Sequence, residues 1–284
     1  MTIIDHHRET QRLPALLIIA AILLFLPTWL WLGEAWISDP YYSHGPLVLI
    51  IALYFIWARR NTLRMERAAP SNLGWPIIGV ALALHLWATV WRAYYISALM
   101  IPLVLLGLGV TLYGWHIARR FLFPLSFLLL MVPLPLAERF GPTLEGWTAM
   151  GATNIAQHMG VAAQNEGAQV LLPNSTFTVG IPCGGLRSAI AIITLASLIA
   201  YIAKGAIWAR GFIFLAAIPI ALIANTLRIA LLFAIANVWG AQTAMDYFHN
   251  ISSPLLFAAA FLLILLLARV LRCSEVRWEV IFPG

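Results

Sequence analysis

The sequence predicts an all-α protein that crosses a membrane many times, with about eight transmembrane helices. Of its 284 residues, 62% are hydrophobic and only 10% are charged, whereas soluble domains carry about a quarter charged residues. The mean hydropathy is +0.89. Long apolar stretches recur along the whole chain, and a helix of about 20 such residues can span the hydrocarbon core of a bilayer.

Short polar connections separate the apolar stretches and leave little room for a soluble domain, so we expect one integral membrane domain over 1–284. The first stretch follows Arg8 and Arg12 without a convincing cleavage site, so we expect it to be kept as a span. The fifth contains Pro124, Pro133 and Pro135. The predicted spans are 14–32, 45–59, 73–91, 94–114, 121–137, 185–203, 211–235 and 252–270.

Basic residues predict the orientation of these spans. The net charge of +6 comes mainly from arginines in short loops, a pattern that concerns membrane orientation and not nucleic acid. With a cytoplasmic N-terminus, 13 of the 17 basic residues lie inside. An even number of spans then places both termini in the cytoplasm. The four remaining basic residues fall outside or near the outer face: Arg92, Arg139, Arg187 and Arg228.

The longest outer segment covers about 137–182. Its first part, 141–163, mixes apolar and polar residues and predicts an amphipathic helix lying along the interface. Its second part, 169–179, alternates around Pro173-Asn174-Ser175, which predicts a short β-hairpin.

Cys183 directly precedes the sixth predicted span and follows this outer segment. A cysteine among apolar residues is often just a small buried side chain. Here Gly184 and Gly185 permit close backbone approach, and the helix N-terminus and Arg187 both favour a thiolate. The pattern therefore predicts a nucleophile at the outer face of the membrane.

Two further polar residues end on the same predicted face. Arg228 stands in apolar sequence, where a charge is costly and marks a functional residue or a side chain that snorkels to the interface. Asn225 shares its helix face and can orient it. His249 precedes the eighth span and is a candidate general base and acid for a thiol. We expect Arg228 to stabilise an oxyanion or hold a substrate carbonyl.

His44, before the second span, is a candidate supporting residue, a rival base or a structural loop residue. A zinc site from Cys183, His44 and His249 has no supporting ligand motif, so we predict neither metal nor cofactor. The other cysteine, Cys273, falls in the cytoplasmic tail and is predicted to be incidental.

The ordered motifs resemble those of the exosortase/archaeosortase family of membrane cysteine transpeptidases, over most of the chain. The family usually has Cys-Ser-Gly where this chain has Cys183-Gly184-Gly185, and a histidine such as His249 resembles the bacterial form. The matching pieces are Tyr42-Ser43-His44-Gly45, Phe123-Pro124, Val132-Pro133-Leu134-Pro135, Cys183-Gly184-Gly185-Leu186-Arg187-Ser188, Ala224-Asn225-Thr226-Leu227-Arg228 and His249.

The resemblance implies a protein of the bacterial inner membrane with its active site on the periplasmic side. It implies substrates that carry a C-terminal sorting signal, with a Pro-Glu-Pro-like motif, a transmembrane helix and a basic tail. Cys183 is then expected to form a thioester that an unidentified acceptor resolves.

The alternatives are a non-catalytic transporter or assembly subunit for exopolysaccharide export, and a membrane acyltransferase. The polar residues gather at one membrane face and not along a path through the midplane, which favours an enzyme.

Overall fold

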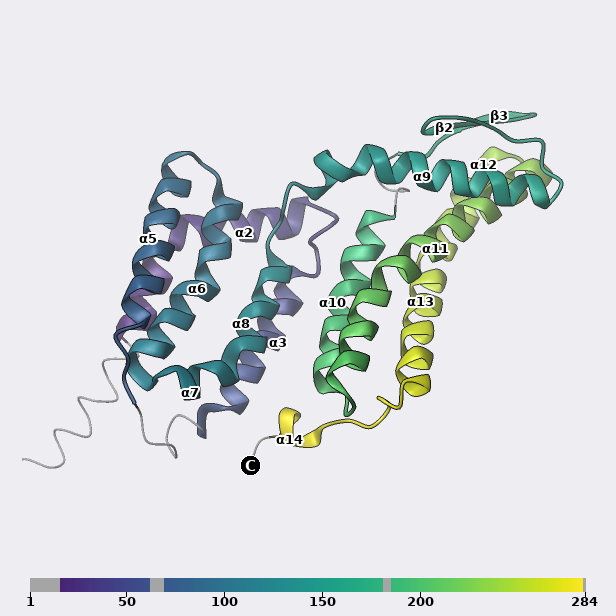
Figure 1. The fold of residues 1–284 in the computed structure, drawn as a ribbon. Helices are drawn as coiled ribbons and strands as arrows, with labels where there is room; N and C mark the ends of the chain where they lie inside the picture. The colour runs from purple at the N-terminus through teal and green to yellow at the C-terminus, as the bar shows by residue number, and fades with distance from the viewer. Residues whose placement is uncertain (1–15, 62–68, 181–184, 283–284) are drawn as a thin grey trace, which may run out of the picture. The chain divides into compact units, whose positions relative to one another are not determined.

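The computed structural model describes residues 16–61, 69–180 and 185–282 (Figure 1). By their internal contacts the residues form two compact units, Met1–Pro133 with Ile281–Gly284, and Leu134–Val280. Helices make up most of each unit, and a small antiparallel sheet belongs to the second.

The first unit is a set of helices joined by short turns. A helix over Leu16–Leu24 meets α2 (Leu26–Ser38) at a bend of 63°. Pro27 stands in the first turn of α2, where a missing N–H costs no helical hydrogen bond. The described residues of this unit also form α3 (Gly45–Ala58), α5 (Gly74–Val90), α6 (Tyr94–Tyr113), α7 (Trp115–Ala118), η1 (Arg119–Phe121), α8 (Leu122–Phe127) and η2 (Leu128–Met131).

Helices α5 and α6 approach each other through glycine. A Cβ atom at Gly74 would collide with Thr111 Oγ1 and the carbonyl oxygen of Gly107. Small residues of this kind let membrane helices pack backbone to backbone, because apolar side chains gain little by leaving lipid.

A buried polar cluster links α2, α5 and α6. His85 Nδ1 lies 2.7 Å from Ser97 Oγ, and Ser97 Oγ lies 2.5 Å from Thr28 Oγ1. All three residues are almost inaccessible, so their hydrogen bonds satisfy polar atoms that an apolar interior would otherwise leave unpaired.

The predicted span 121–137 is not one helix. Short helical pieces, α8 and η2, end at Met131, and α9 (Leu136–His158) starts after the break. Pro133 and Pro135 explain it, because proline lacks an N–H and disfavours helical geometry in the preceding residue. Hydropathy alone could not show this interruption.

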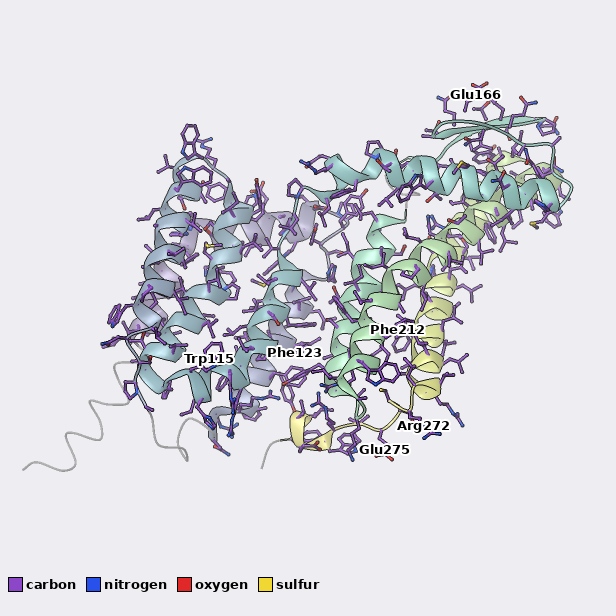
Figure 2. All side chains as sticks on the ribbon, viewed as in Figure 1. Trp115, Phe123, Glu166, Phe212, Arg272 and Glu275 are labelled. Atoms are coloured by element: carbon purple, nitrogen blue, oxygen red, sulfur yellow. The ribbon has the colours of Figure 1, made fainter. Side chains whose placement is uncertain are left out.

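In the second unit, α10 (Leu186–Ile202), α11 (Ile207–Trp239) and α13 (Asn250–Val270) run in alternating directions. Their shared core consists of small and branched residues such as Ile192, Ala217 and Ile264. Figure 1 shows α9 lying across one end of these helices. Figure 2 shows Glu166 at that end and Arg272 and Glu275 at the other. The remaining helices are α12 (Ala241–Thr243), η3 (Ala244–His249) and α14 (Trp278–Ile281).

The helix predicted at 141–163 is observed as α9, shifted toward the N-terminus. Its buried side consists of small residues, Ala149, Ala152 and Ala156, which share a core cluster with Phe233 of α11. Trp147 and Met150 are exposed. The helix is therefore confirmed, and its position along a membrane interface stays a prediction.

The predicted hairpin is part of a three-stranded antiparallel sheet in the order β1-β2-β3. Strands β2 (Gln169–Leu172) and β3 (Ser175–Thr178) form the hairpin. Strand β1 (Gln164–Glu166) was not predicted, since its three residues are all polar and exposed. Val170 and Phe177 bury the inner face of the sheet against the cluster formed by α9 and α11.

The mostly helical membrane fold is confirmed. Among the described residues, α6, α11 and α13 are long and apolar enough to cross a membrane. The bent pair of Leu16–Leu24 and α2 makes a fourth if it is a single span, and α3, α5 and α10 are shorter apolar helices. The count of eight spans and the single domain over 1–284 stay predictions.

Candidate functional site

Arg228 lies inside the second unit, with 7% of its surface exposed. From the middle of α11 it donates a hydrogen bond from Nη1 to Ser253 Oγ on α13, at 2.5 Å. A snorkelling arginine carries its guanidinium to the surface, so this burial favours a role within the helix bundle. A guanidinium has five N–H donors in a planar fork, which suits a carbonyl oxygen or an oxyanion.

Asn225 lies one turn before Arg228 on α11 and is 6% exposed. It touches the residue that precedes the neighbouring helix: a Cβ atom at Gly185 would lie 2.7 Å from Asn225 Nδ2. Gly185 is the N-cap of α10 with a φ of 84°, in the left-handed region that glycine tolerates best. Both its conformation and its surroundings therefore require glycine.

The start of α10 is held by its own hydrogen bonds. The Gly185 carbonyl accepts the Ala189 N–H at 2.9 Å and the Ser188 hydroxyl at 2.9 Å. This end of α10 thus meets α11 at Asn225, while Arg228 connects α11 to α13. Contacts on one face of α11 bring together the ends of the helices that carry the predicted motifs.

Cys183 lies outside the described residues. His249 ends the π-helical stretch η3, which leads into α13 four residues before Ser253. Its backbone is described and its side chain is not. Next to it, Phe248 packs against the core cluster of α9, α11 and the sheet.

The two other supporting candidates differ in their surroundings. Arg187 is exposed in the first turn of α10. His44 belongs to the first unit, where it is the N-cap of α3 and stacks on Tyr42 at 6.1 Å between ring centroids. Burial lowers the pKa of His44, an effect that backbone hydrogen bonds to Leu130 and Tyr41 partly offset. Burial of His44 therefore favours the neutral form of its imidazole.

Ser253 is the contact that sequence reasoning missed. It is partly buried and stands at the start of an apolar stretch beside Ser252, which is buried with 2% exposure. Two adjacent serines at the start of a span are a weak signal, because serine is common near helix starts. No cluster of three or more His, Cys, Asp or Glu side chains is found within residues 16–61, 69–180 and 185–282.

A family model described as transmembrane exosortase matches residues 36–266. No curated protein and no solved structure matches the chain. The matched region contains Asn225, Arg228 and Ser253, together with all of α10 and α11 and most of α13.

Proposed function

Since this chain belongs to the transmembrane exosortase family, we propose that it is a membrane cysteine protease and transpeptidase that processes PEP-CTERM sorting signals. Family membership implies this class of substrate and makes the chain a multi-pass membrane protein. The observation that carries the catalytic proposal is the buried Arg228, hydrogen-bonded to α13 beside the contact between Asn225 and Gly185.

The proposed reaction has two halves. The Cys183 thiolate attacks the carbonyl carbon of the scissile peptide bond, and Arg228 donates hydrogen bonds to the oxyanion that develops. The C–N bond then breaks, the departing amine takes a proton from His249, and a thioester remains on Cys183. An acceptor nucleophile gives its proton to His249, attacks the thioester carbonyl and releases the Cys183 thiolate.

Chain length supports a place for Cys183 in this reaction. Cys183 is two positions before Gly185, and two trans peptide units span about 7 Å at most. Gly185 in turn packs on Asn225, one turn from Arg228. This short tether to Gly185 supports the proposal that the Cys183 thiol acts on a substrate carbonyl held by the Arg228 guanidinium.

The proposed location is the bacterial inner membrane, with both termini in the cytoplasm and Arg228 toward the periplasm. The concentration of basic residues in the predicted inner loops supports this orientation. The proposed partners are secreted proteins with a C-terminal sorting signal, membrane lipids and an acceptor of unknown identity.

The test is substrate processing in cells. A tagged protein with a sorting signal is followed as it loses its tail, in strains carrying wild-type protein, Cys183→Ala or Cys273→Ala. Cys273 is the matched control, because it is the other cysteine and is buried in packing against Gly205. We expect Cys183→Ala to abolish processing at normal membrane abundance, and Cys273→Ala to retain it.

The thioester gives a second readout. Wild-type protein should form an adduct with the substrate that hydroxylamine cleaves, and Cys183→Ala should form none. Normal maturation in the Cys183→Ala strain would remove the proposal and favour a transporter or assembly subunit.

A further inference from the structure

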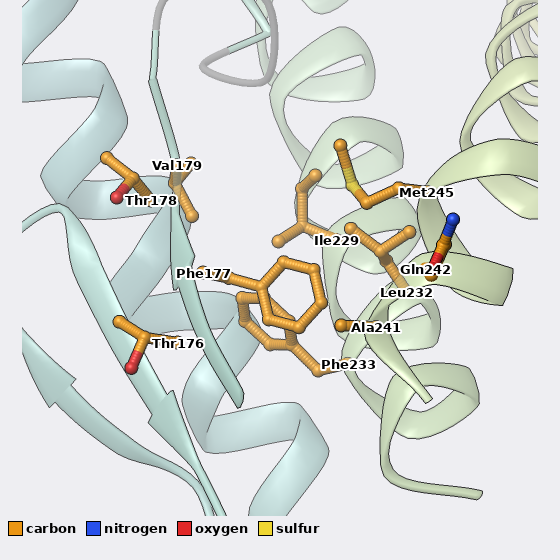
Figure 3. Close-up of a pocket in the computed structure, with 10 residues that line it drawn as sticks. All are labelled: Thr176, Phe177, Thr178, Val179, Ile229, Leu232, Phe233, Ala241, Gln242 and Met245. Carbon is orange, nitrogen blue, oxygen red and sulfur yellow. The ribbon is translucent and has the colours of Figure 1, made fainter. Parts of the chain in front are cut away.

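An apolar cavity of about 370 Å³ lies beside the candidate site in the second unit. Figure 3 shows β3 on one side of it and α11 with the segment that follows on the other. Phe177 from the strand and Ile229 and Phe233 from α11 supply apolar walls. Gln242 and Met245, from the segment after α11, line the cavity across from β3. Ile229 directly follows Arg228 in the sequence, so the cavity and the candidate site share one turn of α11.

Strand β3 is an edge strand, paired on one side with β2. The Val179 N–H donates to the Ala168 carbonyl, which sets the alternation of the ladder. Residues 177 and 179 therefore direct their main-chain groups toward β2, whereas Thr176 and Thr178 direct theirs away from it. Among the described residues, these outward N–H and C=O groups have no main-chain partner.

The backbone of β3, and not only its side chains, borders the cavity. Thr176 and Thr178 line it, although their side chains point away from α11 in Figure 3. Phe177 points the other way and meets Phe233 at 5.7 Å between ring centroids. A strand edge beside an apolar hollow is the arrangement that binds extended peptides, with hydrogen bonds from the main chain and pockets for alternate side chains.

We propose that the extended part of the sorting signal binds as an added strand on β3 and places an apolar side chain in this cavity. The inference rests on the proposed function and names the surface that recognises its substrate. A Pro-x-Pro segment fits an edge strand, because both prolines direct their missing N–H groups to the same side. The middle residue then presents its N–H and C=O to Thr176 or Thr178.

The first test detects binding without catalysis. A photo-crosslinking amino acid is placed at Gln242 in protein that also carries Cys183→Ala, and a sorting-signal peptide is added in detergent micelles. Val238 is the control position, because it is 67% exposed near the end of α11 and does not line the cavity. We expect the peptide to crosslink from position 242 and not from position 238.

The second test removes one hydrogen-bond donor from the strand edge. Thr178→Pro deletes the outward N–H, which an edge strand tolerates. We expect Thr178→Pro to lower kcat/KM for the peptide about tenfold, as for one lost hydrogen bond. Met245→Trp should raise KM by filling the cavity, and Val238→Trp should not.

The outcomes separate this inference from the proposed function. Equal crosslinking from positions 242 and 238, with wild-type kinetics for Thr178→Pro and Met245→Trp, would overturn the strand-addition site while loss of processing in Cys183→Ala still stands. Crosslinking to lipid alone from position 242 would also overturn it and assign the cavity to an acyl chain. Processing that survives Cys183→Ala would instead remove the nucleophile, even where the peptide still crosslinks at 242.

Discussion

Burying a charged guanidinium in an apolar helix bundle is energetically unfavourable, so a buried arginine is a functional candidate. Placing an arginine at the centre of a membrane helix costs about 2.5–3.5 kcal/mol on insertion scales. The hydrogen bond from Arg228 to Ser253 on the next helix offsets part of this unfavourable free energy. The same bond fixes the direction of the side chain, which an oxyanion binder requires before the substrate arrives.

Arg228→Lys tests this role at a single residue. Lysine keeps the charge and the reach but loses the planar fork of donors, so we expect cleavage of a sorting-signal substrate to slow by about a hundredfold to a thousandfold. Arg187→Lys is the control, because Arg187 is exposed and should lose much less. The initial rate of tail removal is the measurement. Near-wild-type cleavage by Arg228→Lys would take Arg228 out of the catalytic set.

Buried polar residues could be predicted from the sequence where they stand within an apolar segment. Arg228 and Asn225 stand out in this way, and both are buried on one face of α11. Ser253 does not stand out, because a serine near a span start gives no sign of which helix it faces. The partner of a polar side chain depends on the rotation of two helices, which hydropathy does not encode.

At the scale of elements, the start of α10 depends on one glycine. Gly185→Ala adds strain at a positive φ and a contact of 2.7 Å with Asn225. Gly160→Ala is a matched control with a φ of 86° and open space around the new methyl group. Gly160→Ala should lower the free energy of unfolding by the backbone strain alone, of order 1–3 kcal/mol. Gly185→Ala should lower it clearly more.

Thermal unfolding in detergent, together with the rate of substrate processing, measures both variants. Equal losses of stability would mean that Asn225 moves aside freely and does not hold α10 in place. If Gly185→Ala lowers the melting temperature but preserves processing, catalysis does not depend on the exact position of α10.

Elements with strong periodic or apolar patterns could be predicted, and those shaped by local chemistry could not. The hairpin of β2 and β3 follows from alternation around Pro173. Strand β1 carries no such pattern, since its stability comes from pairing with β2. The stretch 121–137 shows the opposite case, where apolar composition suggests one helix and Pro133 and Pro135 break it.

At the scale of the whole molecule, the second unit carries exposed charged residues at both of its ends. Glu166 lies at the end with the sheet, and Glu275 at the end with Arg272 (Figure 2). The sequence predicts these ends on opposite sides of the membrane through its basic residues. Orientation depends on insertion and not on packing, so the fold alone does not decide it.

Cysteine labelling tests that orientation. In a chain with Cys183→Ala and Cys273→Ser, a membrane-impermeant maleimide should label Glu166→Cys in intact spheroplasts and Glu275→Cys only after the membrane is opened. Both positions are exposed, so reactivity reports the side of the membrane. Labelling in the reverse order would put Arg228 toward the cytoplasm, out of reach of secreted substrates.

The π-helical stretch η3 determines which changes of chain length α13 can tolerate. It occupies Ala244–His249 and leads directly into α13, and such stretches correspond to one extra residue in an α-helix. Each residue turns an α-helix by about 100°, but a π-helical stretch takes up its extra residue locally and does not pass this rotation to the helix that follows. Deleting one residue of η3 should therefore leave a regular α-helix with Ser253 still facing Arg228, whereas deleting one residue of α11 between Asn225 and Arg228 should rotate Arg228 away from Ser253.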